Sequence, residues 1–166
     1  AKYSGKKIEY YDNEINESYT PYVIETSIGV DRMVLAVLSH SFKEETLENG
    51  EKRVVMSIPA ALAPVKAAVL PLVKKDGLPE LAQSIMDDLK YDFNCQYEEK
   101  DSIGKRYRRQ DAIGTPFCIT VDHESLNDHC VTLRDRDTMQ QERVPIEKLR
   151  SIIDEKVNMT NLLRRL

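Results

Sequence analysis

An uninterrupted apolar run stands near the middle of the 166-residue sequence: Ala67-Ala68-Val69-Leu70-Pro71-Leu72-Val73. Such a run, without polar alternation, is typical of a strand that is buried on both faces of a sheet. Asp76-Gly77 follows it with turn chemistry, and a segment with helical spacing then begins. A buried strand that leads into a helix starts a strand-helix-strand unit, so the pattern predicts an α/β fold here.

The alternation of strands and helices continues toward the C-terminus. Helical spacing or strand-like runs predict helices over 78–91 and 103–112, strands over 93–98 and 116–121, a closing hairpin of 130–134 with 141–145, and a terminal helix over 146–156. The strand-helix-strand units pair in parallel, and the hairpin adds antiparallel strands. We therefore predict a mixed sheet of about five strands flanked by helices.

Upstream of the apolar run, the pattern predicts an antiparallel tail. We expect strands over 7–11 and 19–27, a helix over 30–42 whose apolar face packs against them, and a strand over 53–58. Prolines at positions 59 and 64 then interrupt regular structure. The predicted domains are residues 1–60 and residues 61–166.

Composition excludes several classes of protein. Hydrophobic residues make up 41% and charged residues 31% of the chain, which is typical of a folded globular protein. No apolar run approaches the roughly 18 residues that span a bilayer, and no signal-peptide core is present, so we expect a cytoplasmic protein without a membrane partner. The net charge of −4 gives no global attraction to a polyanion. Binding of nucleic acid therefore requires a local basic patch.

The cysteines and histidines do not predict a metal site or a disulfide framework. The chain has three cysteines, an odd number, and none of them forms a CxxC pair. A short window holds Cys118, His123, His129 and Cys130. Their spacing matches no paired-ligand zinc pattern, so we predict no metal.

The first candidate site is a junction of a strand, a glycine and a helix: Tyr22-Val23-Ile24-Glu25-Thr26-Ser27-Ile28-Gly29-Val30-Asp31-Arg32. Gly29 permits close approach of a ligand, and Arg32 lies in the first turn of the predicted helix. An arginine there can donate two hydrogen bonds to a phosphate. This spacing is short and common, so the residues alone favour a surface arginine and a strand-end glutamate beside a helix cap.

This junction resembles motif 3 of class II aminoacyl-tRNA synthetases, and its form Val-Ile-Glu-x-Ser-x-Gly-Val-Asp-Arg resembles the glycyl enzyme in particular. Many members have proline where this chain has Thr26. The resemblance implies that Arg32 is catalytic and holds the γ-phosphate of ATP. It further implies two sets of binding residues: for glycine, Glu25, Thr26, Ser27, Ile28 and Gly29; for ATP, Gly29, Val30, Asp31 and Arg32. A carboxylate such as Glu25 suits the ammonium group of glycine.

The second candidate site is the basic segment Gly104-Lys105-Arg106-Tyr107-Arg108-Arg109-Gln110-Asp111, together with the turn Leu133-Arg134-Asp135-Arg136-Asp137. Charge runs are usually solvated helix faces, and the charges of the turn can pair with one another. The functional interpretation is a phosphate-contacting RNA surface on which an aromatic ring stacks. The candidate tRNA-binding residues are Lys105, Arg106, Tyr107, Arg109, Arg134 and Arg136.

Residues 102–114, 116–122 and 131–137 are together similar to the anticodon-binding domain of glycyl-tRNA synthetases. The resemblance implies part of a homodimeric glycine-tRNA ligase, which activates glycine with ATP and Mg²⁺ and transfers it to the 3′ end of tRNA(Gly). The implied nucleic-acid partner is tRNA and not DNA, and no cofactor is expected to bind tightly to this chain. Because motifs 1 and 2 of the family should precede Ala1, we expect the chain to be inactive alone.

Two alternatives stay open at this point. The chain could be the anticodon-binding region of another class II synthetase, prolyl, threonyl or histidyl, because these enzymes have relatives of the Arg-Asp-Arg-Asp turn. It could also be a non-catalytic tRNA-binding module. Glu25 and Arg32 together speak against both, since neither alternative accounts for the glycyl form of motif 3.

Overall fold

The computed structural model describes residues 3–164, and the chain divides into two compact units, Ala1–Met33 and Val34–Leu166. In the first unit, β1 (Tyr10–Asp12) pairs antiparallel with β2 (Glu17–Tyr19). The rings of Tyr10 and Tyr19 meet edge to face at 5.9 Å. Residues 20–29 then form neither strand nor helix.

The prediction of a strand over 19–27 is therefore wrong beyond its first residue. An extended segment becomes a strand only when a neighbour satisfies its backbone N–H and C=O groups. No residue within 3–164 pairs with 20–29, and the side chains of Tyr22 and Ile24 are almost fully exposed.

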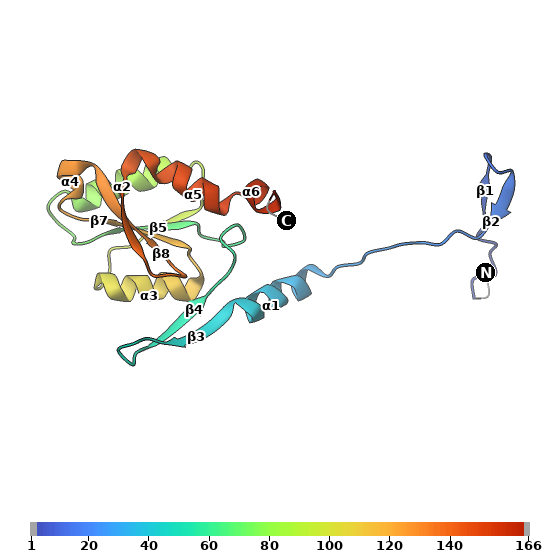
Figure 1. Cartoon of the computed structure of the whole chain (residues 1–166), viewed down its shortest axis with the longest axis horizontal. Helices are drawn as coiled ribbons and strands as arrows, with labels where there is room; N and C mark the ends of the chain where they lie inside the picture. Colours follow the sequence, from blue (N-terminus) through green and yellow to red (C-terminus); the bar gives the residue numbers. More distant parts are fainter. Residues whose placement is uncertain (1–2, 165–166) are drawn as a thin grey trace. The chain divides into compact units, whose positions relative to one another are not determined.

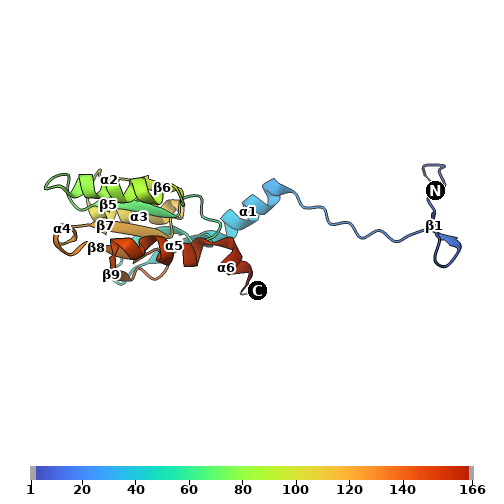
Figure 2. The same cartoon turned by 90° about the horizontal axis from the view of Figure 1, so that it is seen from above.

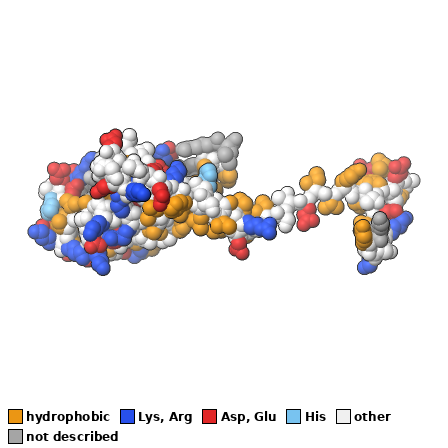
Figure 3. Space-filling view, turned by 90° about the horizontal axis from the view of Figure 1, so that it is seen from below, with side chains coloured by type: hydrophobic (Ala, Val, Ile, Leu, Met, Phe, Trp, Pro, Cys, Tyr) orange, Lys and Arg blue, Asp and Glu red, His pale blue; other side chains and the backbone are white. Residues whose placement is uncertain are grey.

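The helix α1 (Val30–Ser41) forms almost as predicted. It begins where the N–H of Met33 donates to the Gly29 carbonyl at 3.1 Å. Its apolar side chains Val30, Leu35 and Leu38 are all exposed. Figure 3 shows hydrophobic side chains uncovered along this part of the chain. The predicted helix is confirmed, and the packing of its apolar face on the preceding strands stays a prediction.

The second unit contains the predicted mixed sheet (Figure 1). Its order is β6-β5-β7-β8-β9. β5 pairs in parallel with β6 and β7, whereas β8 pairs antiparallel with β7 and β9. The bounds are β5 Ala67–Pro71, β6 Cys95–Tyr97, β7 Phe117–Val121, β8 Cys130–Asp135 and β9 Gln141–Pro145. The predicted fold class is confirmed.

Helices cover both faces of this sheet (Figures 1 and 2). α2 (Leu78–Leu89) connects β5 to β6, and α3 (Ile103–Ile113) returns from β6 to β7 on the other side of β5. Right-handed crossovers that run in opposite directions place their helices on opposite faces. α5 (Leu149–Val157) shares the face of α2, and their buried side chains form one core with the sheet.

The C-terminal segment departs from the single helix predicted over 146–156. A 3₁₀ turn, η1 (Ile146–Lys148), precedes α5, and α6 (Met159–Leu163) follows it. Asn158 separates α5 from α6. Its backbone is extended, and its side chain accepts a hydrogen bond from the Thr160 N–H as the N-cap of α6. A short helix α4 (Ser125–Asp128) was also not predicted.

A second hairpin packs against α3. β3 (Phe42–Thr46) follows α1 directly and pairs antiparallel with β4 (Lys52–Met56). In β4, the side chains of Arg53 and Val55 are each only 1% exposed. The division into domains 1–60 and 61–166 stays a prediction, and the structure adds that β4 contacts α3 across that boundary.

Gly114 ends α3 where the hairpin comes closest, which gives a prediction for stability. Its φ is +88°, and a Cβ would lie 3.0 Å from the Met56 carbonyl oxygen. We expect Gly114→Ala to lower the free energy of unfolding by about 2–3 kcal/mol, measured by urea denaturation. Gly50→Ala is the matched control, because Gly50 has φ +81° and open space around it. Equal losses in both variants would show that the close approach contributes nothing.

Candidate nucleic-acid interface

A pocket of about 510 Å³ lies beside the basic helix α3. Its walls come from the β3–β4 turn, from α3, from β8 and from the segment that leads into β9. Three of its lining residues carry positive charge. The lining residues are Glu51, Gly104, Lys105, Tyr107, Arg108, Arg134, Met139 and Gln141.

Arg134 lies at the bottom of this pocket and is only 4% exposed. Its two terminal nitrogens donate to both carboxylate oxygens of Asp111, at 2.8 and 3.1 Å. Burial acts to lower the pKa of Arg134, but the hydrogen bonds to Asp111 outweigh it and hold that pKa above its ordinary value. The guanidinium carbon also lies 4.7 Å from the centre of the Tyr107 ring. Arg134 is thus fixed from two sides where a ligand would reach it.

Tyr107 is half-buried, so it does not project freely from the helix. Its hydroxyl lies 2.6 Å from the Thr120 Oγ1, and Arg134 stacks on its ring. Burial raises the pKa of Tyr107. The ring forms part of the pocket wall and holds Arg134, which is a more restricted role than the open stacking surface that the sequence predicted.

The rim of the pocket carries the accessible charge. Lys105 is exposed, and Arg108 lies 3.6 Å from the Glu51 carboxylate across the pocket mouth. Both positions face outward because the helix buries Arg106 and Gln110 instead. Sequence reasoning missed Glu51 and Met139, since neither belongs to a charge run or a recognisable motif.

Arg106 lies inside the protein, although the sequence made it a candidate for RNA contact. It is 1% exposed, and its guanidinium donates to the carbonyls of Pro71, Glu98 and Leu72 at 2.6, 3.2 and 3.2 Å. Burial lowers its pKa. It ties the ends of β5 and β6 to α3, so we assign it to the fold and not to the RNA surface.

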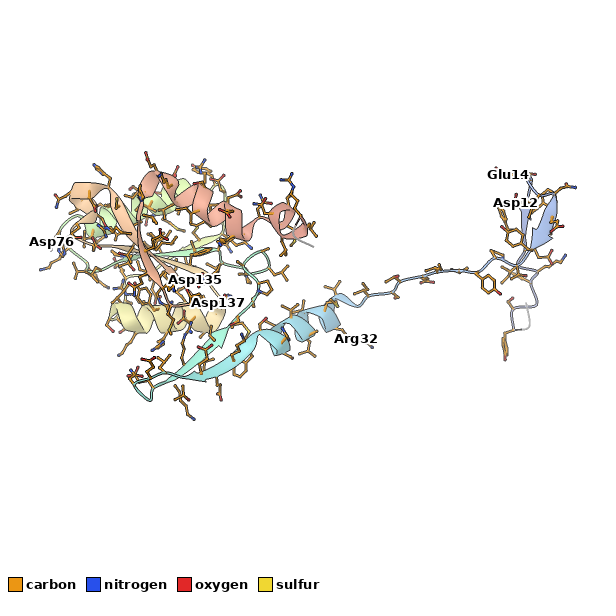
Figure 4. The ribbon with its side chains drawn as sticks, viewed as in Figure 1. Asp12, Glu14, Arg32, Asp76, Asp135 and Asp137 are labelled. Atoms are coloured by element: carbon orange, nitrogen blue, oxygen red, sulfur yellow. The ribbon has the colours of Figure 1, made fainter. Side chains whose placement is uncertain are left out.

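Arg136 is likewise buried, at 2% exposure. It donates to the carbonyls of Gly114 and Ile58, both at 2.8 Å, and to the Asp137 carboxylate. Asp137 lies in the turn after β8, close to Asp135, the last residue of that strand (Figure 4). These contacts join the turn to the end of α3, which leaves Arg136 no free donor face for a base. We correct its assignment to a structural role.

Arg109 remains at the surface but is already paired. It donates to the Glu98 carboxylate at 2.6 Å and to the Asp101 carboxylate at 2.9 Å. Its pKa is raised chiefly by the hydrogen bond to Glu98, and the same type of bond lowers the pKa of Asp101. Two carboxylates beside one guanidinium reduce the attraction that Arg109 offers to a phosphate.

The segment that resembles motif 3 belongs to the first compact unit, whereas the residues that line the pocket belong to the second. Residues 20–29 are exposed apart from Pro21, and Arg32 projects from the first turn of α1 (Figure 4). Within residues 3–164, no side chain forms a hydrogen bond or ion pair with Glu25, Ser27 or Arg32. The roles predicted for Glu25, Thr26, Ser27, Ile28, Gly29, Val30, Asp31 and Arg32 stay predictions.

The cysteine-histidine window does not converge on one point. In the part of the chain that the structure describes, no group of three or more His, Cys, Asp or Glu side chains is placed to hold a metal ion. Cys118 is buried in β7, and burial raises the pKa of its thiol to about 12, so it stays protonated. Nor does any described helix have the length and apolarity needed to cross a bilayer.

The comparisons with known proteins fit this fold and this basic pocket. The family model "Anticodon binding domain" matches residues 66–156, more than half of the chain. The matched region contains the whole five-stranded sheet and α3. The chain therefore belongs to the family of anticodon-binding domains.

Its curated relatives include proteins named glycine-tRNA ligase. The chain is 54% identical over 154 residues to the one from Macrococcus caseolyticus, covering 93% of this chain and 33% of that protein. It is 55% identical over 158 residues to the one from Clostridium perfringens, with the same two shares. The chain thus spans about a third of the length of these relatives.

Two solved structures show the same fold at low sequence identity. The RNA-binding domain of threonyl-tRNA synthetase from Cryptosporidium parvum matches with a TM-score of 0.55 and 24% identity, over 60% of this chain and 25% of that one. Prolyl-tRNA synthetase from the same organism matches with a TM-score of 0.56 and 16% identity, over 74% of this chain and 32% of that one. Identities this low support the fold alone.

Proposed function

We propose that this chain is the C-terminal part of a glycine-tRNA ligase and that its pocket binds the anticodon end of tRNA(Gly). The observation that carries the proposal is the pocket beside α3, with Lys105 and Arg108 at its rim and Arg134 at its floor. Cationic rims attract phosphates, and a fixed arginine below them can donate to the edge of an unstacked base. The relatives named glycine-tRNA ligase support this choice over prolyl or threonyl enzymes, which share only the fold.

In the full-length enzyme, we infer, residues 25–32 contribute to the site that binds glycine and ATP with Mg²⁺. The supporting observation is that Glu25 and Arg32 are exposed and form no side-chain bond within residues 3–164. Those groups, and the uncovered apolar side chains of α1, are available to a larger catalytic domain. A homodimer, as the resemblance implies, is part of the same proposal.

The test of RNA binding is a titration of the 166-residue chain with an anticodon stem-loop of tRNA(Gly) at several salt concentrations. Each phosphate contact on a single strand contributes about −0.7 to the slope of log K against log salt. We expect Lys105→Ala to flatten the slope by about 0.7, because its ammonium is exposed at the pocket rim. Lys156→Ala is the control, since Lys156 lies on α5, which covers the opposite face of the sheet.

A stem-loop with a scrambled anticodon separates phosphate contact from base recognition. Arg134→Ala should reduce the preference for the authentic loop, because Arg134 is the fixed donor at the pocket floor. Undetectable affinity at low salt would reject the proposal. So would equal salt slopes for Lys105→Ala and the unmodified chain.

A further inference from the structure

Three buried charged residues from three separate elements meet under the pocket floor. Asp111 of α3 is fully buried, and Arg134 of β8 and Arg53 of β4 are 4% and 1% exposed. Arg53 donates from Nε to the Asp111 Oδ2 at 2.9 Å, and Arg134 donates to both oxygens of the same carboxylate. Asp111 is therefore the point at which the β3–β4 hairpin meets the pocket arginine.

The three residues of this cluster share one negative charge, so the position of each side chain depends on the other two. One buried carboxylate serves two buried guanidinium groups, and a carboxylate with two cationic neighbours has its orientation fixed by both. Glu45 accepts a hydrogen bond from the Arg53 Nη1 at 2.8 Å. Its carboxylate is more exposed than that of Asp111, so it neutralises Arg53 only in part. If Arg53 were removed, the Asp111 carboxylate would lose one of the two partners that fix its orientation under Arg134.

Arg53 has a third contact that fixes its own position. Its Nη2 donates to the backbone carbonyl of Arg136, in the turn that follows β8. This one side chain thus holds the helix carboxylate, the strand-end turn and, through Glu45, its own hairpin. The same hairpin supplies Glu51 to the pocket rim. The position of the β3–β4 hairpin therefore affects both the floor of the pocket, through Arg53, and its mouth, through Glu51.

Arg134 is the only one of the three that lines the pocket among the residues the structure describes. An arginine side chain has many rotamers, and a recognition site gains affinity when its donors are ordered before the ligand arrives. Asp111 on one side and the Tyr107 ring on the other provide that order. Arg53 has no surface of its own to offer to RNA.

We propose that Arg53 is a positioning residue for tRNA binding: it orients Asp111, which holds Arg134 at the pocket floor, so the affinity of the pocket depends on a hairpin outside the five-stranded sheet. This inference rests on the proposed function, because it concerns the same pocket. It adds a residue that lies outside the region matched by the anticodon-binding family model.

The test is a double-mutant cycle in affinity for the tRNA(Gly) anticodon stem-loop. We expect Arg53→Met to weaken binding by about tenfold, the size of one charge-assisted hydrogen bond. In the Arg134→Met background, the same change should alter the affinity by no more than about twofold, because Arg53 then has no Arg134 side chain through which to affect the RNA. A parallel cycle with Lys105→Ala serves as the control, and there the two losses should multiply.

Circular dichroism confirms that each variant is folded at the titration temperature. Arg53→Lys gives the same test with the buried charge retained, since one ammonium cannot span Asp111, Glu45 and the Arg136 carbonyl. Losses that multiply for Arg53 and Arg134, or unchanged binding in a folded Arg53 variant, overturn the positioning role alone. If Arg134→Met itself leaves the affinity unchanged, the pocket assignment fails, and the proposed function fails with it.

Discussion

Replacing Arg32 with alanine in the full-length enzyme should slow the formation of glycyl-adenylate by about 10²–10³-fold, the usual loss for one preorganised charge-stabilising donor. Arg32 lies in the first turn of α1, is exposed, and has no carboxylate partner within residues 3–164. Its guanidinium is therefore available to a phosphate. The measurement is pyrophosphate exchange at saturating glycine.

His40→Ala provides a control on the same helix, because His40 lies in the last turn of α1 and is exposed. It should leave the exchange rate close to that of the unmodified enzyme. An Arg32→Ala enzyme whose exchange rate stays within tenfold of normal would contradict the assignment of Arg32 to the ATP site.

Replacing Asp111 with asparagine should lower the free energy of unfolding by about 3–5 kcal/mol, the usual effect of removing one partner from a buried ion pair. The amide keeps the shape of the side chain, but it leaves the guanidinium of Arg134 buried without a counter-charge and that of Arg53 with only the partly exposed Glu45. It also places an N–H₂ group against donors. Urea denaturation of the 166-residue chain measures the change.

Asp101→Asn is the matched control, because Asp101 forms a surface ion pair with Arg109 and is exposed. Surface pairs contribute little to stability, so this variant should unfold close to the unmodified chain. If Asp111→Asn and Asp101→Asn unfold at similar urea concentrations, the buried cluster does not stabilise the fold in the way described.

The five-stranded sheet could be predicted because its strands carry strong local signals. β5 is apolar throughout and β7 is apolar except for Thr120, and the turn after β8 separates two strands that pair as a hairpin. Parallel order followed from the helices between the strands. The predicted and observed strands therefore agree closely from residue 67 onward.

Upstream of residue 60, local signals were misleading for two segments, β3 and residues 20–29. β3 reads Phe-Lys-Glu-Glu-Thr, a polar sequence with low strand propensity, and it forms because β4 pairs with it. Residues 20–29 show the opposite mismatch between local sequence and structure. They look like a strand, but the described residues supply no partner for their backbone.

The site could be located from the sequence but not resolved into roles. The basic run pointed to α3, yet the helix turns inward the positions of Arg106, Tyr107, Gln110 and Asp111, which are polar. Only Ile103 and Tyr107 of this helix pack on the apolar core, so the inward face gives little hydrophobic periodicity to reveal it. Which arginines were buried thus depended on carbonyls and carboxylates far away in the sequence, such as those of Pro71 and Asp111.

The junction of α1 with β3 has no spare residue, since the helix ends at Ser41 and the strand begins at Phe42. Ser41 is buried, and its carbonyl accepts from the Ser57 N–H at 2.7 Å. Because no linker residue separates α1 from β3, the two elements cannot change their orientation independently. A helix of 12 residues is about 18 Å long, so this direct connection joins the first turn of α1, which carries Arg32, rigidly to the hairpin that carries Arg53.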